Sequence, residues 1–190
     1  MKGKIIILSA PSGTGKSTVI HRLMENAALN LGFSISATSR KPRNGETDGK
    51  DYYFITEEEF TARIERGEFV EYEEVYAGTH YGTLKSEIER VCDSGRNLIM
   101  DIDVKGGINV KKLYGDRALS IFLAPPGMEI LEKRLRGRGT DDEQTIRRRL
   151  DKAGFEMGFA PEFDLTVVND CLDKAVAEIE RAITGFIARP

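Results

Sequence analysis

The chain is poor in the residues that build metal centres and disulfide frameworks. Its 190 residues include two cysteines, Cys92 and Cys171, and two histidines, His21 and His80. The cysteines stand far apart and the histidines form no cluster, so neither pair has metal-ligand spacing. We therefore expect reduced thiols in a cytoplasmic protein, with no zinc centre and no disulfide scaffold.

Long hydrophobic runs and a strong net charge are also missing. The first apolar run, "KIIIL", is broken at once by "SAPSG", which argues against a signal peptide and a membrane span. The formal net charge is −3, so the surface as a whole does not attract polyanions. We expect neither a nucleic-acid nor a membrane partner, and any phosphate site must come from a local basic cluster.

Short apolar runs alternate with helical patterns along the chain. Runs that are apolar at most positions are typical of strands buried on both faces of a parallel sheet. This alternation predicts a doubly wound α/β fold with a parallel five-stranded sheet, and the length suits one domain. The expected strands are residues 5–8, 33–38, 98–102, 119–123 and 165–168, and the helices that follow most of them are 16–26, 107–114, 129–136 and 172–187.

Two polar regions interrupt this alternation. Residues 39–95 hold a loop, a helix with a capping box from Thr56 to Glu59, the exposed antiparallel strand "FVEYEEVY" and a helix that ends at Gly95. Residues 134–150, "RLRGRGTDDEQTIRRRL", predict two helices joined by a glycine-containing turn, with the composition of a mobile lid. We therefore expect one domain, with a core formed by 1–38, 96–133 and 151–190, an inserted subdomain at 39–95 and a helical lid at 134–150.

The stretch "SAPSGTGKST", residues 9–18, has the pattern of a phosphate-binding loop (P-loop) between a strand and a helix. Gly13 and Gly15 let the backbone aim its N–H groups at phosphate oxygens, and the following helix adds the positive end of its dipole. Lys16 can reach the β- and γ-phosphates, and the Ser17 hydroxyl can hold Mg²⁺. Ala10 replaces the first glycine of the usual pattern, at a position that mainly needs a small residue. The expected nucleotide-binding residues are Ala10, Pro11, Ser12, Gly13, Thr14, Gly15, Lys16, Ser17 and Thr18.

A phosphate loop is shared by GTPases, ATPases and small-molecule kinases. The base-reading N-K-x-D pattern of GTPases is absent from the sequence. A loop-rich insertion and an arginine-rich lid favour a kinase, because such enzymes close over their substrates and keep water away from the γ-phosphate.

Basic and acidic residues after the second strand indicate what accepts the phosphate. Arg40 and Arg43 flank a proline-containing turn, and guanidinium groups grip phosphate with paired hydrogen bonds, to which Ser36 and Tyr52 could add neutral donors. Carboxylates are poor phosphate partners, so acids further along should face something else. The N1–H and N2–H₂ donors of guanine suit a carboxylate, and adenine has no such pair. The candidates for this second group are Glu71, Tyr81, Thr83, Asp101 and Asp103.

Taken in order, "SAPSGTGKST", "FSISATSRKPRNGETDGKDYYF", "YGT", "DIDVKG", "RLRGRGT" and "VVND" resemble the guanylate kinase family along almost the whole chain. The resemblance implies a transferase that moves the γ-phosphate of ATP to GMP, and to dGMP, with Mg²⁺, giving ADP and GDP. It places Ser36, Arg40, Arg43, Tyr52 and Tyr81 at the GMP phosphate, and Glu71, Thr83 and Asp103 at guanine. It also places Asp101 with Ser17 at the metal, and Asn169 and Asp170 at the edge of the adenine pocket. The implied catalytic residues are Lys16, Arg43, Arg138 and Arg149, with Arg134 as a further lid arginine.

Several alternatives stay open at this point. The stretch from Glu71 to Tyr81 is one residue longer than is usual in the family, so Glu73 or Glu74 could read guanine in place of Glu71, which we favour. Asp101 and Asp103 could simply cap the next helix, and Lys105 stands where many relatives have glutamine. A scaffold domain that only binds partners, or a kinase for another nucleotide or a sugar phosphate, would share the fold. The intact phosphate loop and the lid arginines favour an active enzyme.

Overall fold

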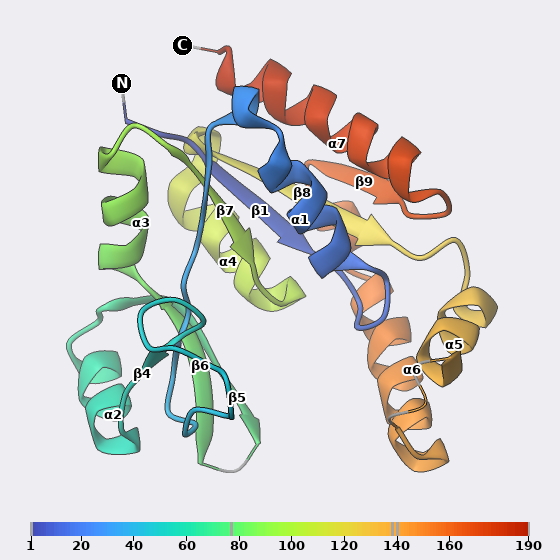
Figure 1. The fold of residues 1–190 in the computed structure, drawn as a ribbon, viewed down its shortest axis with the longest axis horizontal. Helices are drawn as coiled ribbons and strands as arrows, with labels where there is room; N and C mark the ends of the chain where they lie inside the picture. Colours follow the sequence, from blue (N-terminus) through green and yellow to red (C-terminus); the bar gives the residue numbers. More distant parts are fainter. Residues whose placement is uncertain (1, 77, 138, 140, 190) are drawn as a thin grey trace.

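A computed structural model describes residues 2–189 except 77, 138 and 140. Its centre is a parallel five-stranded sheet, which confirms the predicted α/β class (Figure 1). The strand order is β2 (Leu31–Phe33), β7 (Asn97–Asp101), β1 (Ile5–Ser9), β8 (Ala118–Ala124) and β9 (Leu165–Val168). All the carboxyl ends of these strands therefore lie along one edge of the sheet.

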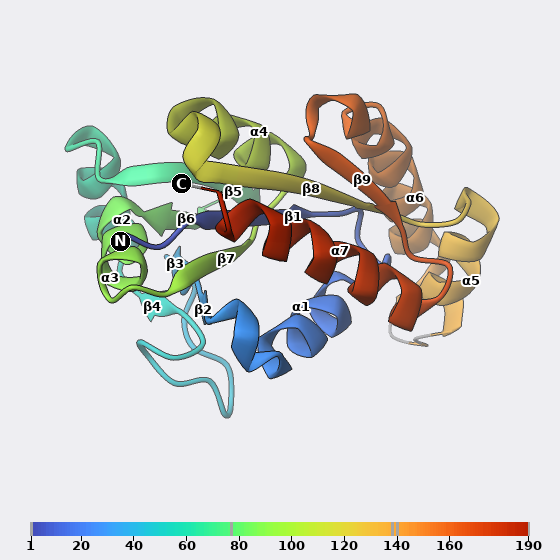
Figure 2. The same cartoon turned by 90° about the horizontal axis from the view of Figure 1, so that it is seen from above.

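Helices cover both faces of this sheet (Figure 2). On one face, α1 (Lys16–Glu25) and α7 (Leu172–Ile187) pack against Ile6 and Leu8 of β1. On the other face, α3 (Lys85–Asp93) and α4 (Val104–Tyr114) pack against Ile5 and Ile7. Successive side chains of a strand point to opposite faces, so a strand covered on both sides is apolar at every position. This explains the continuous "IIIL" run.

A second, four-stranded sheet forms most of the inserted region. Its order is β4 (Tyr53–Phe54), β3 (Ala37–Thr38), β6 (Thr79–Leu84) and β5 (Phe69–Tyr76), with β5 and β6 antiparallel. Helix α2 (Glu57–Glu65) covers it through Phe60, whose ring stacks on Phe69 at a centroid distance of 4.3 Å. The predicted cap of α2 is present, since the Thr56 hydroxyl accepts a hydrogen bond from the Glu59 N–H at 3.2 Å.

The strand expected at 33–38 is two strands in different sheets, so this prediction was wrong. β2 ends at Phe33 in the large sheet, β3 starts at Ala37 in the small sheet, and residues 34–36 cross between them. The run is apolar in both strands, although Phe33 at the end of β2 is exposed and Ala37 of β3 is buried in the core of the small sheet. The apolar run at 33–38 therefore looks the same in the sequence whether it forms one strand or passes from one sheet to the other.

The two sheets are joined at a second place, where β6 runs directly into α3 at Lys85. Glu87 of α3 is buried, with 2% of the residue exposed, and its carboxylate accepts hydrogen bonds from the Ile35 N–H at 2.9 Å and the Tyr53 hydroxyl at 3.0 Å. Arg90 neutralises it through two hydrogen bonds of 2.8 Å. Through Glu87, helix α3 is therefore hydrogen-bonded both to the crossing segment 34–36 and to β4 of the small sheet.

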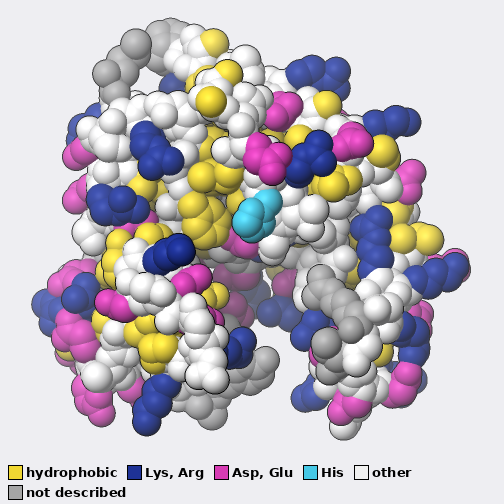
Figure 3. All heavy atoms as spheres, viewed as in Figure 1, with side chains coloured by type: hydrophobic (Ala, Val, Ile, Leu, Met, Phe, Trp, Pro, Cys, Tyr) yellow, Lys and Arg dark blue, Asp and Glu magenta, His cyan; other side chains and the backbone are white. Residues whose placement is uncertain are grey.

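Helices α5 (Met128–Gly137) and α6 (Glu143–Met157) form a separate lobe, held by Leu131, Leu135, Ile146 and Ala153. This lobe and the small sheet stand on either side of a hollow at the carboxyl ends of the large sheet (Figures 1 and 3). Short 3₁₀ helices lie at Ala27–Leu29, Gly115–Arg117 and Ala160–Glu162. Within the described part of the chain, no helix is long and apolar enough to cross a membrane.

Candidate active site

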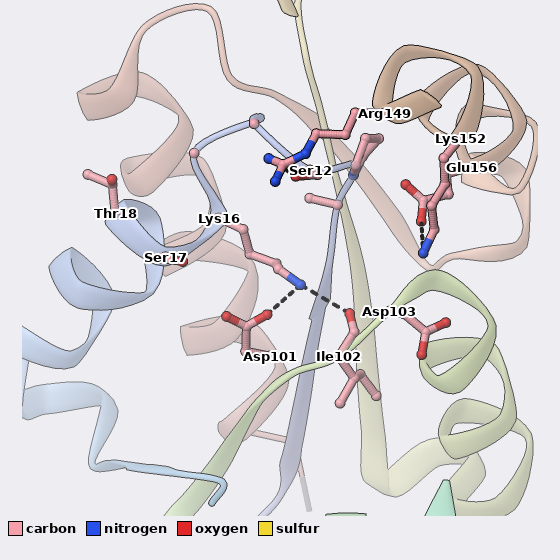
Figure 4. Close-up of a pocket in the computed structure, with 14 residues that line it drawn as sticks. Ser12, Lys16, Ser17, Thr18, Asp101, Ile102, Asp103, Arg149, Lys152 and Glu156 are labelled. Carbon is pink, nitrogen blue, oxygen red and sulfur yellow. Dashed lines mark hydrogen bonds and ion pairs between the residues drawn. The ribbon is translucent and has the colours of Figure 1, made fainter. Parts of the chain in front are cut away.

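A cavity of about 420 Å³ opens where β1 turns into α1 (Figure 4). Most of its lining comes from the predicted phosphate loop, from the end of β7 and from α6. We call it the donor cavity. It is lined by Ala10, Pro11, Ser12, Gly13, Gly15, Lys16, Ser17, Thr18, Asp101, Ile102, Asp103, Arg149, Lys152 and Glu156.

The loop has the backbone expected of a phosphate cradle. Gly13 and Gly15 have φ values of +92° and +98°, a region that side chains with a Cβ rarely adopt. Gly15 is also the N-cap of α1, so the positive end of that helix faces the donor cavity. An anion in this cavity would therefore meet backbone N–H groups and a favourable dipole.

Lys16 has partners at the end of β7 in the described structure. Its ammonium forms an ion pair with the Asp101 carboxylate and donates to the Ile102 carbonyl at 3.2 Å (Figure 4). Asp101 is thus a partner of the phosphate-loop lysine. Asp103 does cap the next helix, since its Oδ1 accepts from the N–H groups of Lys105 at 2.8 Å and Gly106 at 3.1 Å.

A second cavity, of about 150 Å³, adjoins the first, and we call it the acceptor cavity. The two cavities share the wall formed by Asp101, Ile102 and Asp103. Ligands that fill both would therefore meet at the carboxyl end of β7. The acceptor cavity is lined by Ser36, Tyr52, Glu71, Glu73, Tyr81, Gly82, Asp101, Ile102 and Asp103.

Glu71 and Asp103 converge in the acceptor cavity. A Cβ added at Gly106 would lie 3.1 Å from Glu71 Oε2 and 3.0 Å from Asp103 Oδ2, so both carboxylates approach the same glycine. The buried Thr83 hydroxyl donates to Glu71 Oε1 at 2.7 Å. Burial raises the pKa of Glu71 to about 7, and the neighbouring charge of Asp103 adds to the rise.

The strand register places the three candidate glutamates differently. Glu71 pairs with Thr83 and Glu73 with Tyr81, and the pairing is regular from Glu71 to Glu74. It is irregular on either side of this segment, between Phe69 and Glu71 and between Glu74 and Tyr76. Glu74 turns back and accepts a hydrogen bond from the Gly78 N–H at 2.9 Å. Glu71 therefore stands opposite Thr83, and the irregularity inside residues 71–81 lies after Glu74.

The basic loop lies beside the acceptor cavity. Arg40 donates to the Tyr81 hydroxyl at 3.0 Å and makes two hydrogen bonds of 2.9 Å to Glu46, which lower the pKa of that glutamate. Its guanidinium also lies 5.5 Å from the centroid of the Tyr52 ring. Arg43 is exposed and stands outside the described linings of both cavities, while its backbone N–H donates to Glu46 at 2.7 Å.

The lid arginines differ from one another. Arg149 lines the donor cavity, 3.5 Å from the Ser12 hydroxyl and 3.3 Å from the Asp141 carboxylate. Arg138 lies outside the described residues. Arg134 donates to the backbone carbonyls of Thr14 at 3.3 Å and Asn169 at 2.9 Å, so it contacts the outer side of the phosphate loop.

The two residues expected at the adenine edge are also unlike each other. Asn169 is 6% exposed, and its side-chain amide donates to the Thr14 carbonyl at 2.8 Å. Asp170 is exposed and stands outside the linings described for both cavities.

Two residues of the site were missed by the sequence analysis, and a third, Glu73, was named only as an alternative to Glu71. Lys152 and Glu156 of α6 line the donor cavity, and Glu73 of β5 lines the acceptor cavity. The Lys152 ammonium lies 3.8 Å from Glu156 and 4.0 Å from Glu73, so it links α6 to β5. The first two could have been found, because Arg149, Lys152 and Glu156 are spaced along one helix face. Burial raises the pKa of Glu156.

A phosphate loop with its lysine, an adjoining cavity with paired carboxylates and an arginine-bearing lobe define a P-loop phosphotransferase that holds two ligands end to end. Such an arrangement suits a kinase for a small phosphorylated acceptor.

Comparisons with known proteins give the family within this class. Residues 2–185 match the family model for guanylate kinase. The chain is 58% identical to a guanylate kinase of Porphyromonas gingivalis, over 98% of this chain and 99% of that protein, and 55% identical to one of Bacteroides thetaiotaomicron, over 98% and 91%. The crystal structure of guanylate kinase from Anaplasma phagocytophilum is similar, with a TM-score of 0.76 and 32% identity over 99% of this chain and 88% of that one. The chain belongs to the guanylate kinase family and is a nucleoside monophosphate kinase.

Proposed function

We propose that the chain transfers the γ-phosphoryl group of ATP to GMP, and to dGMP, giving ADP and GDP. ATP occupies the donor cavity and the monophosphate occupies the acceptor cavity. The observation that carries this assignment is the wall of Asp101, Ile102 and Asp103, which both cavities share. The γ-phosphate of one ligand and the phosphate of the other meet there, as an in-line transfer requires.

Guanine is recognised by the paired carboxylates of the acceptor cavity. Glu71 and Asp103 accept hydrogen bonds from the N1–H and N2–H₂ groups, and Thr83 orients Glu71 through its 2.7 Å hydrogen bond. Ser36, Tyr52 and Tyr81 lie along the same cavity and donate to the GMP phosphate with Arg40 and Arg43. Arg40 is held by Glu46, so the phosphate competes with that carboxylate or joins it on the other side of the guanidinium.

Charge neutralisation at the transferring group comes from Lys16, Arg149 and Arg138. No strong base is needed, since the acceptor phosphate is already an anionic nucleophile, and positioning does most of the work. Asn169 and Asp170 border the adenine. Water is excluded when the insertion, 39–95, and the lid, 134–150, close over both nucleotides.

Mg²⁺ fits the donor cavity. No group of three or more histidine, cysteine or acidic side chains that could form a metal cage occurs in the described part of the chain. Magnesium in kinases is usually held by one or two side chains together with phosphates and water, and the Ser17 hydroxyl and Asp101 supply such a pair beside the loop. When bound, the ion neutralises charge on the phosphate oxygens.

A coupled assay with GMP, dGMP, IMP, AMP and CMP tests the proposal. AMP leaves the two carboxylates without donors, so its kcat/KM should fall by roughly 10⁴ relative to GMP. IMP keeps N1–H and loses the 2-amino group, so it should fall between the two. Turnover without preference for guanine would contradict the base assignment, and binding of both nucleotides without ADP formation would indicate a domain that only binds.

Variants of the three glutamates locate the base contact. Glu71→Gln exchanges an acceptor oxygen for a donor NH₂ and should weaken GMP by about 1.5–3 kcal/mol while affecting AMP little. Glu74→Gln is the matched control, because Glu74 bonds to the Gly78 N–H and should leave the GMP/AMP ratio unchanged. If Glu73→Gln narrows the ratio and Glu71→Gln does not, the reading residue is Glu73.

A further inference from the structure

The outer side of the phosphate loop is held at one carbonyl group by two separate elements. The Thr14 carbonyl accepts from the Asn169 side-chain amide at 2.8 Å and from the Arg134 guanidinium at 3.3 Å. A second nitrogen of Arg134 donates to the Asn169 carbonyl at 2.9 Å, which ties the two donors together. The Asn169 backbone is itself fixed, since its N–H donates to the Ala124 carbonyl at 2.8 Å.

These contacts are built into a packed region. Thr14 is fully buried and Asn169 is 6% exposed. A Cβ added at Gly15 would lie 2.8 Å from the Asn169 amide nitrogen, and one added at Gly13 would lie 2.8 Å from Leu135 of α5. The loop therefore packs closely against Asn169 at Gly15 and against α5 at Gly13, and the hydrogen bonds are sheltered from competing water.

The direction of the Thr14 carbonyl decides the direction of the next N–H group. In a trans peptide unit the C=O and the following N–H point in opposite directions. Because the Thr14 carbonyl points outward to Asn169 and Arg134, the Gly15 N–H points to the opposite side, toward the donor cavity that Gly15 lines. Gly15 is at one end of this peptide unit and has a positive φ, and it has no side chain that would fix the direction of the unit.

We propose that Arg134 and Asn169 are positioning residues that hold the Thr14–Gly15 peptide so that the Gly15 N–H faces the donor phosphates. The inference rests on the proposed function, because it concerns the site assigned to ATP. It gives both residues a role through the loop backbone that requires no contact with the base or with the transferring phosphoryl group. It also couples α5, the first helix of the lid, to the phosphate loop.

Calorimetric binding of two probes, ATP and inorganic tripolyphosphate, tests this role, because tripolyphosphate has no base. Asn169→Asp keeps the shape of the side chain and removes its donor, and Arg134→Met removes the guanidinium. Each variant should lose roughly tenfold in affinity for both probes, by the same factor, as expected for one hydrogen bond. Steady-state kinetics should show a raised KM for ATP with the KM for GMP within twofold of the parent value. Arg134→Lys, which keeps one donor, should recover part of the loss.

Arg136→Met is the matched control. It removes an arginine from the same helix, where the guanidinium pairs with Glu132 at 2.9 Å, and it should bind both probes like the parent protein. Loss of ATP affinity with unchanged tripolyphosphate affinity would overturn the inference and assign both residues to the base. Parent-like binding of both probes by both variants would also overturn it. If the parent protein binds neither ATP nor tripolyphosphate, the proposed function itself is wrong. If Asn169→Asp does not fold, Arg134→Met decides.

Discussion

Glu71 gives the acceptor cavity a pH dependence near neutrality. Its pKa is raised to about 7, above the ordinary value of 4.5, because burial penalises the carboxylate. Only the carboxylate can accept both guanine donors, so GMP should bind more tightly as the pH rises from 6 to 8. With one group titrating at about 7, the expected decrease in the KM for GMP is about tenfold. The KM measured at each pH with saturating ATP checks this.

Glu71→Gln serves as the control, because it cannot titrate and leaves only the ionisation of the GMP phosphate itself. A parent profile that matches the variant profile would contradict the role of Glu71.

The raised pKa of Glu71 also affects the stability of the folded protein. A folded pKa above the unfolded one means that the folded state binds more protons between these values, so stability falls as the pH rises through that window. At pH 8 the variant should therefore be more stable in urea, by at most about 3 kcal/mol.

At the scale of single elements, we expect α6 to act mainly in catalysis and the loop after β3 to act mainly in binding GMP. Arg149 of α6 lines the donor cavity, where its guanidinium contacts the Ser12 hydroxyl at 3.5 Å and the Asp141 carboxylate at 3.3 Å, and we expect it to bind phosphate there. Arg149→Ala should lower kcat by roughly 10²–10³ with a smaller effect on the KM for GMP. Arg43→Ala should raise the KM for GMP strongly. Steady-state kinetics in both substrates separates the two effects.

Arg148→Ala is the control for α6. The Arg148 side chain is exposed and donates to the Thr145 hydroxyl at 3.2 Å, so its loss should leave kcat nearly unchanged. If Arg148→Ala and Arg149→Ala are equally damaging, or if Arg149→Ala changes only the KM for GMP, this division between the lid and the acceptor site is wrong.

The elements that could be predicted from the sequence are those whose signal is local. Helix α7 was predicted with its observed bounds, Leu172–Ile187, because its apolar face repeats through the whole length. The phosphate loop was predicted because its residues are consecutive. The change of sheet after Phe33 was missed, since a strand pattern does not say which strand it pairs with. The partners of Arg134 were missed as well. They are backbone carbonyls, and since every residue has one, the sequence does not indicate which carbonyl accepts a hydrogen bond.

At the scale of the whole molecule, both lobes beside the hollow should move when the nucleotides bind. The small-sheet insertion and the α5–α6 lobe each carry arginines whose charge phosphates would neutralise, and Lys152 at 4.0 Å from Glu73 is a first contact between the two sides. Amide hydrogen exchange should slow in residues 39–95 and 134–150 when GMP and a non-hydrolysable ATP analogue are both present. Exchange in β8 is the internal reference. Identical exchange with and without the ligands would exclude closure.

The small sheet is attached to the large one at two places, residues 34–36 and the junction of β6 with α3, and Glu87 binds to both sides of this attachment. Two fixed points in a body define a line, and the only rigid movement that leaves both in place is a rotation about it. We therefore expect the insertion to swing about this line as one body. The side chains assigned to guanine and to the GMP phosphate would then move on arcs around the same axis, so their spacing is kept while a bound GMP is carried toward the donor cavity.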